Sequence, residues 1–122
     1  MATITPATAS STTPPLCNPV ASTPAGDEIT VGANQELFVI LDNGHVSSIT
    51  VTIPGQASSI SVGSKGPGSF TPTSKSIAVV NGTSRLLHIP RDQISGFRNG
   101  SGRVEVQYTS GNAALTVQAI VA

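Results

Sequence analysis

Charged residues are scarce in this 122-residue chain, and the charges that are present cancel. Lysine and arginine number 6, aspartate and glutamate number 6, and the formal net charge at pH 7 is +0. Charged residues make up 10% of the sequence, against about 25% in typical globular domains. A neutral chain has no long-range field that would attract nucleic acid or an anionic membrane surface. We therefore expect neither nucleic acid nor membrane as a partner.

Cysteine and long apolar runs are also rare. Cys17 is the only cysteine, so the chain cannot close an intramolecular disulfide, which excludes a disulfide-stapled scaffold. Met1 to Ser10 contain neither the basic region nor the apolar run of a secretion signal. No apolar stretch approaches the roughly 20 residues needed to span a bilayer. These absences favour a protein that is made and assembled inside a cell.

Aromatic residues are few, with no Trp, one Tyr and three Phe. At this length the chain supports one hydrophobic core, which must be built from Val, Ile and Leu. The aromatic residues Phe38, Phe70, Phe97 and Tyr108 are too dispersed to form a stacking platform for sugars or bases. A carbohydrate- or cell-surface-binding module remains an alternative function, but the sequence contains no aromatic strip to support it.

The residue types of catalysis and metal binding occur without the spacing that their chemistry needs. His45 and His88 are the only histidines, and neither has a metal-ligand partner at short spacing. A cluster of glycines beside Lys65 superficially suggests a phosphate loop, but no apolar strand precedes it and no helix follows. These glycines are Gly63, Gly66 and Gly68. There is no Gly-x-Ser-x-Gly elbow and no evident pair of facing carboxylates. We predict no catalytic, cofactor-binding or metal-binding residues, and hence no enzyme.

The first 26 residues form a segment of their own, without any charged residue and rich in Thr, Ser, Pro and Ala. Five prolines exclude a helix and any central strand, so residues 1–26 are predicted to be an extended N-terminal arm. A disordered tail is the alternative reading. The hypothesis is that the arm lies along a partner, with Ile4, Leu16 and Val20 as apolar anchors. Deletion of residues 1–24 should then leave a folded domain that binds its partner weakly.

Residues 27–122 carry the pattern of short β-strands separated by Gly and Pro turns. Alternating or continuous apolar residues predict strands at Ile29–Val31, Glu36–Leu41, Ser47–Ile53, Ser58–Val62, Lys75–Val80, Arg85–Ile89, Arg103–Thr109 and Leu115–Val121. The run Leu37 to Leu41 does not alternate, which indicates a central strand or one covered by a neighbouring chain. Gly63 to Thr73 is predicted to be a long irregular loop. Seven or eight such strands without helical periodicity predict a small all-β, antiparallel β-sandwich.

Three turns are predicted to close hairpins. Asn43-Gly44 and Asn81-Gly82 have the composition of type I′ turns, and Ser110 to Asn112 separate the last two strands. Asn81 and Asn99 also begin Asn-x-Ser/Thr sequences, which we interpret as turns. In the closing pair, Val104, Val106 and Tyr108 face inward, so Val106→Asp should unfold the domain. Ile120 would face outward at the end of the pair, where a neighbour could pack.

The chain from Gly32 onward, and its part Lys75 to Ala122 in particular, resembles small proteins encoded among the structural genes of tailed bacteriophages. The resemblance rests on Ser76-Ile77-Ala78-Val79, the turn and strand Gly82 to Leu87, Pro90, the strand Gly102 to Tyr108, and the Val- and Ala-rich final strand. These proteins look like head decoration or minor capsid proteins, which are compact β-domains on the outside of the capsid shell. The long loop and the Thr- and Pro-rich arm do not match that pattern.

The resemblance implies a virion structural protein that binds the major capsid protein and stabilises the outer surface of the capsid after synthesis in the host cytoplasm. The expected contact residues are Ile4, Leu16 and Val20 in the arm, Phe70 in the loop, and Ile120. A homo-oligomer, most simply a trimer, is implied in the same way. The alternative within phages is a tail or head-to-tail component.

Overall fold

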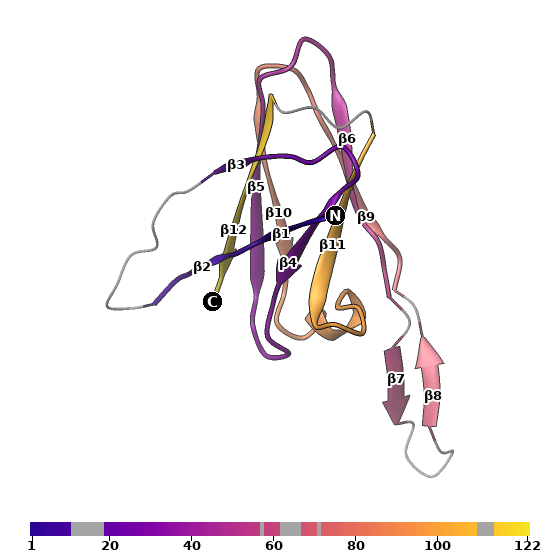
Figure 1. Ribbon diagram of the computed structural model, residues 1–122. Coiled ribbons are helices and arrows are strands. Elements are labelled where there is room, and N and C mark those ends of the chain that lie inside the picture. Colours follow the sequence, from indigo (N-terminus) through magenta and orange to yellow (C-terminus); the bar gives the residue numbers. More distant parts are fainter. Residues whose placement is uncertain (11–18, 57, 62–66, 71, 110–113) are drawn as a thin grey trace.

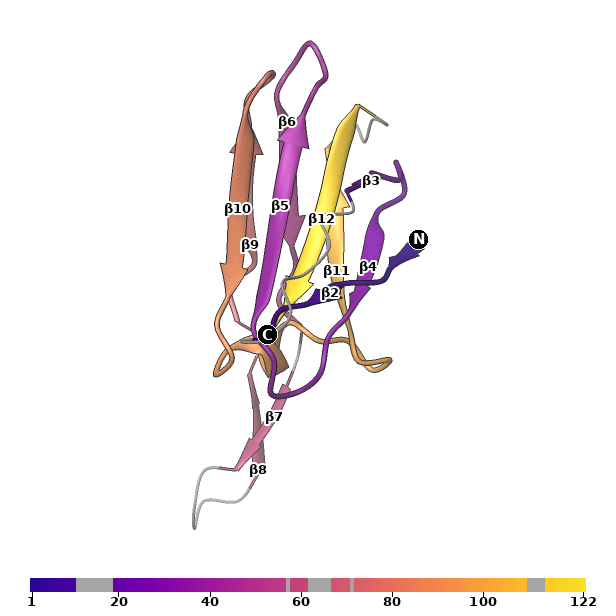
Figure 2. The ribbon, with the colours of Figure 1, turned by 90° about the vertical axis from the view of Figure 1, so that its left-hand side faces the viewer.

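In this computed structural model the chain is a β-sandwich whose two sheets face one another (Figures 1 and 2). The structure describes residues 1–10, 19–56, 58–61, 67–70, 72–109 and 114–122, and for 58–61 and 67–70 the description covers the backbone. The elements in chain order are β1 (Ala2–Ile4), β2 (Ala7–Thr8), β3 (Val20–Ala21), β4 (Asp27–Thr30), β5 (Leu37–Asn43), β6 (Ile49–Ile53), β7 (Ser58–Ser61), β8 (Pro67–Phe70), β9 (Lys75–Val79), β10 (Ser84–Ile89), the 3₁₀ helix η2 (Ile94–Gly96), β11 (Arg103–Tyr108) and β12 (Leu115–Val121). The predicted all-β fold is confirmed.

The strands of the body pair in two sheets, and the arm extends both. The first sheet has the order β1-β4-β11-β6-β9, and the second has the order β10-β5-β12-β2, with β3 also paired to β12. Pairing within the body is antiparallel, as predicted, but β1 runs parallel to β4 and β2 runs parallel to β12. The sheets are therefore mixed, because the arm adds a strand to the edge of each one.

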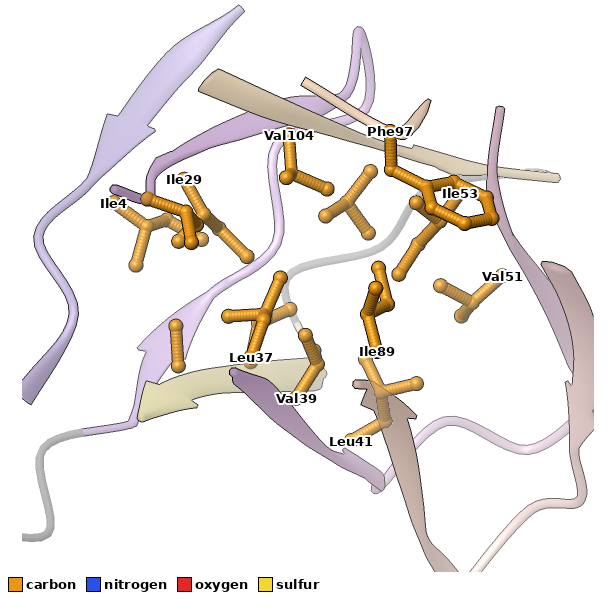
Figure 3. Packing of buried hydrophobic residues seen from close by; sticks show 14 of the residues in the cluster. Ile4, Ile29, Leu37, Val39, Leu41, Val51, Ile53, Ile89, Phe97 and Val104 are labelled. Carbon is orange, nitrogen blue, oxygen red and sulfur yellow. The ribbon is translucent and has the colours of Figure 1, made fainter. Parts of the chain in front are cut away.

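The core lies between the sheets (Figure 3). It is built from inward residues of β1, β4, β5, β6, β9, β10, β11 and β12, together with Ile94 and Phe97 from the connection before β11. On β5 the buried apolar residues are Leu37, Val39 and Leu41, all at 0% exposure, which is the period of two expected for a strand. Full burial of each Val, Leu or Ile contributes about 1.5–3 kcal/mol. The core is almost entirely aliphatic, as the composition requires.

The three predicted hairpins are wrong. β5 pairs with β10 and β12 while β6 pairs with β9 and β11, so the turn after Asn43 crosses from one sheet to the other. The turn at Gly82 and the connection from β11 to β12 also join strands of different sheets. Alternation predicts which face of a strand is buried. It does not predict whether the next strand in the chain pairs with it in the same sheet or lies across the core in the other sheet.

At Asn81-Gly82 the sequence predicted the turn correctly, although it predicted the strand pairing wrongly. Gly82 has a φ of 73°, and the Thr83 amide donates to the Val80 carbonyl at 3.1 Å, which closes a β-turn. Gly44 is not among the glycines with positive φ, so the predicted type I′ turn at that position is also wrong. There Asn43 makes the corner instead, since its side chain is buried and donates to the carbonyls of Ser47 and Val79.

A second correction concerns the segment predicted to be an irregular loop. Residues 67–70 form β8, which pairs antiparallel with β7 in register from Ser58↔Phe70 to Ser61↔Pro67. This two-stranded sheet is separate from the two main sheets and projects from one end of the sandwich (Figures 1 and 2). With the arm strands, it brings the total to twelve strands in the described part of the chain, against the seven or eight predicted.

Candidate interaction surface

The outer faces of the two sheets differ in chemistry. The residues that point outward from the first sheet, as alternation and register place them, are Glu28, Thr30, Thr50, Thr52, Ser76, Ala78, Arg103, Glu105 and Gln107. They are polar except for Ala78, and they bond to one another. Thr52 and Ser76 hydroxyls lie 3.1 Å apart, and the Arg103 guanidinium contacts the Glu28 carboxylate at 3.1 Å. This is an ordinary hydrated sheet surface.

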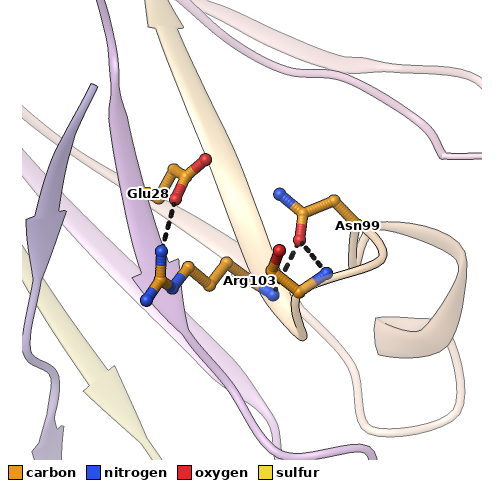
Figure 4. Close-up of polar contacts among 4 residues, drawn as sticks. Glu28, Asn99 and Arg103 are labelled. Atoms are coloured by element: carbon orange, nitrogen blue, oxygen red, sulfur yellow. Dashed lines mark hydrogen bonds and ion pairs between the residues drawn. The ribbon is translucent and has the colours of Figure 1, made fainter.

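Figure 4 shows how the polar face ends at the turn before β11. The Asn99 side-chain oxygen accepts hydrogen bonds from the amides of Ser101 and Arg103, at 2.9 and 3.1 Å. Gly102 completes the turn with a φ of 74°. The interpretation of Asn99 as a turn residue is therefore confirmed. The Arg103–Glu28 pair is partly exposed, so it contributes at most about 1 kcal/mol.

The second sheet carries an apolar cluster on its outer face. Register aligns Leu86 on β10 with Ile40 on β5 and Gln118 on β12, and the next row aligns His88, Phe38 and Ile120. We call these six residues the outer patch. Leu86 is 55% exposed, while Phe38, Ile40 and Ile120 are half-buried. Apolar side chains from three neighbouring strands thus form one continuous surface, which is the usual mark of an interaction site.

The aromatic end of the outer patch is held in a fixed geometry. The rings of Phe38 and His88 are stacked, with centroids 4.6 Å apart and an angle of 6° between the planes. The Glu36 carboxylate lies 3.7 Å from His88 Nε2. His88 was predicted to lie on the outer strand face, which is confirmed. The stack and the carboxylate contact together orient the imidazole, so this end of the patch presents a pair of stacked rings.

Gln118 is the least satisfied polar residue of the outer patch. Its side chain is 8% exposed, and its Nε2 has no hydrogen-bond partner among the residues that the structure describes. A buried donor without an acceptor destabilises a fold by about 1–3 kcal/mol. Such a group in a native protein needs a reason, and its place beside Ile40 and Ile120 connects it with the outer patch.

The arm packs against its own sandwich, along the side edge that β4 and β12 form. Ile4 lies in the core at 7% exposure, and Val20 on β3 is 36% exposed and pairs with Val117. Both residues line a cavity of about 340 Å³ between the arm and β4. The two predicted anchors are thus brought together, but against their own sandwich. Leu16 and the side chain of Phe70 lie outside the described residues, and Ile120 falls within the outer patch.

A buried polar contact fixes the junction between the arm and the body. Asp27 is 1% exposed, and its Oδ2 accepts hydrogen bonds from the Tyr108 hydroxyl at 2.7 Å and the Thr23 amide at 3.1 Å. Burial, reinforced by the hydrogen bond and the charge of Asp27, raises the pKa of Tyr108 well above its usual value. Gly26, with a φ of 99°, turns the chain into β4. The arm therefore leaves the body along a defined path.

Sequence reasoning found only part of the outer patch. The unbroken run Leu37 to Leu41 was expected to serve a core or an interface, and it supplies Phe38 and Ile40. Leu86 was missed, although the consecutive pair Leu86-Leu87 was a usable signal, because one of two neighbouring strand residues must face outward. Gln118 carried no signal, since its burial depends on its neighbours in the sheet.

Other site chemistry was sought in the described ranges. No group of three or more His, Cys, Asp or Glu side chains there is placed to hold a metal ion. Within the same ranges, no helix has the length and apolarity required to cross a membrane. Comparison with protein-family models, with curated proteins and with solved structures finds no match to this chain.

Proposed function

We propose that this chain is a virion structural protein that decorates the outer surface of a tailed-bacteriophage capsid, with the outer patch as its contact to the major capsid protein. The observation that supports the proposal is the apolar, register-aligned surface of Phe38, Ile40, Leu86 and Ile120 on one sheet, opposite a polar face on the other. The resemblance to phage structural proteins, which extends in pattern from Gly32 onward, supplies the class of partner.

We thus place the contact with the major capsid protein on the second sheet and not on the arm. Ile4 is buried in its own core, so its side chain is already engaged and has little area left to offer to a second protein. Leu86, by contrast, leaves more than half of its surface exposed. Burial of apolar surface contributes about 25 cal/mol per Å². Covering an exposed side chain such as Leu86 would therefore contribute most to the free energy of binding.

A modest affinity per copy is sufficient for this function. Many copies bind the repeating shell, and each contact holds neighbouring shell subunits together, so weak contacts add up over the lattice. The low charge of the chain, 10% of residues, fits a contact based on apolar area and hydroxyl groups. Such binding would depend only weakly on salt.

Co-sedimentation with empty capsids tests the proposal. The capsids are assembled from the major capsid protein of the same source, and bound protein is measured in the pellet. We expect Leu86→Asp to abolish binding, because a carboxylate would have to be desolvated at the contact. The matched control is Ala78→Asp, which also alters the outer face of an edge strand, but in the first sheet. Failure of the unaltered protein to sediment with capsids would contradict the proposal.

Two further measurements separate the alternatives. A labelled antibody against the chain, viewed on whole virions, distinguishes the head from the tail. Light scattering gives the mass of the free protein in solution. A smaller oligomer in Leu86→Asp than in the unaltered protein would instead assign the outer patch to contacts between copies of this chain.

A further inference from the structure

A second candidate site lies apart from the outer patch, at the end of the sandwich next to β8. It is a cavity of about 380 Å³ between the start of β9 and the connection that contains η2. Its polar lining residues are Thr73, Lys75, Asp92, Gln93 and Ser95, and its other lining residues include Pro72. Ligand pockets usually measure about 300–1,000 Å³, so this cavity has room for one small ring.

The wall of the cavity is built by close packing. Gly96 is buried, and a Cβ atom at this position would lie 2.9 Å from Cγ of Pro72. The Gly96 carbonyl accepts a hydrogen bond from the Gln56 amide at 2.7 Å, and neighbouring Phe97 is 2% exposed within the core. These contacts fix the wall of the cavity that Gly96 and Pro72 form, and binding pockets are usually largely preformed in this way.

The polar lining combines hydrogen-bond donors and acceptors without a net charge. In the described part of the chain, none of the five polar side chains has a hydrogen bond or ion pair with another residue; Lys75 Nζ lies 5.8 Å from the centre of the Phe97 ring. Lys75 donates, Asp92 accepts, and the amide of Gln93 and the hydroxyls do both. An anion would meet Asp92 and a cation would meet Lys75, so the lining favours a neutral ligand.

We propose that this cavity binds the ring of a neutral sugar. A sugar ring offers several hydroxyls, each both donor and acceptor, which match the mixed lining of Asp92, Gln93 and Ser95. Its C–H face suits the apolar surface of Pro72. Such a site needs no exposed aromatic strip, so the scarcity of aromatic residues does not exclude it. The inference is independent of capsid binding, because none of the cavity residues belongs to the outer patch.

Titration of the full-length protein by NMR tests this inference. The neutral probes are methyl α-glucoside, methyl α-mannoside, methyl β-galactoside and N-acetylglucosamine, and the charged probes are glucuronic acid and glucosamine. We expect at least one neutral probe to bind and to shift the resonances of residues 72–75 and 92–97. Absence of binding by all neutral probes would overturn the inference, as would a preference for either charged probe.

Two variants assign the binding to the cavity. Ser95→Trp fills the cavity from an exposed position and should abolish binding, whereas Asp92→Ala should raise the Kd by about tenfold or more through loss of a charged acceptor. Gln107→Trp, on the polar face of the first sheet, is the control and should leave the Kd unchanged. Circular dichroism confirms that each variant is folded. Unchanged binding in a folded Ser95→Trp protein would overturn the inference.

Discussion

Individual polar residues decide how tightly this sandwich holds together, and Asn43 is the clearest case. It is fully buried, its Nδ2 donates to the carbonyls of Ser47 and Val79, and its Oδ1 accepts from the His45 amide. Asn43→Ala leaves the buried Val79 carbonyl unsatisfied and removes two partly buried hydrogen bonds, so it should lower the free energy of unfolding by about 2–4 kcal/mol. Urea unfolding measures the change. The exposed Asn34→Ala serves as control, and equal effects in both variants would contradict the assigned role.

Gln118 is the opposite case, because its replacement should stabilise the protein. Replacement by Met, which has a similar volume, removes an unpaired buried donor, so Gln118→Met should stabilise the free protein by about 1 kcal/mol. Thermal unfolding measures the gain, and Gln107→Met on the exposed polar face should remain within about 0.5 kcal/mol of the unaltered protein. A lower melting temperature for Gln118→Met would show that the amide has a partner in solution.

Tyr108 links stability to alkaline pH. Its pKa is raised in the folded protein by burial and by Asp27, whereas an unfolded tyrosine titrates near pH 10. The neutral phenol is therefore favoured by folding, and its contribution is complete below about pH 10 and is lost as the pH rises above that value. Because Tyr108 is the only tyrosine, Tyr108→Phe should show a smaller loss of stability between pH 9 and 11, roughly the range spanning that titration.

The measurement is urea unfolding across that pH range, with the ultraviolet absorbance of tyrosinate as a direct probe. The absorbance of the unaltered protein should rise only on unfolding. Ionisation of Tyr108 at its ordinary pH in the folded protein would contradict the buried contact with Asp27.

At the scale of the element, strand positions followed from the sequence, but strand pairing did not. β11 and β12 were predicted almost to the residue, because Val104, Val106, Leu115 and Val117 alternate with polar residues. Their supposed hairpin was wrong because the pattern states which face is buried, not which strand lies beside it. β8 was missed since Pro67 and Gly68 are unfavourable in strands. Ile4 was predicted to anchor the arm to a partner, whereas its side chain is buried in the core of its own domain.

The arm strands are expected to stabilise the domain that they extend. Ile4→Ala removes a buried side chain and should lower the free energy of unfolding by about 2–4 kcal/mol. Val20→Ala, at a half-exposed position on β3, should have a smaller effect. Urea unfolding compares the two variants. Equal effects, or none, would show that the arm is only loosely attached in solution.

Deletion of residues 1–21 extends the same test. It uncovers the edges of β4 and β12, which pair with β1, β2 and β3, and exposed strand edges promote self-association. We expect a lower melting temperature and a larger apparent mass in size-exclusion chromatography, instead of the intact domain that the sequence suggested. A monomer with an unchanged melting temperature would favour the original prediction.

The whole molecule presents two unlike faces, and the proposed function requires that the apolar one contacts another protein. The first sheet is polar outside, whereas the second carries Phe38, Ile40, Leu86 and Ile120. The hairpin β7–β8 projects from one end of the sandwich, and the arm covers one side edge (Figure 1). Burial of the outer patch against a shell would leave the polar sheet exposed to water.

Electron cryomicroscopy of particles that carry this protein tests that orientation most directly. We expect density for the sandwich on the outside of the capsid, with β10, β5 and β12 facing the shell and the sheet of β4, β11, β6 and β9 facing the solvent. A map in which the polar sheet faces the shell, or in which the particle surface lacks this density, would contradict the proposed function.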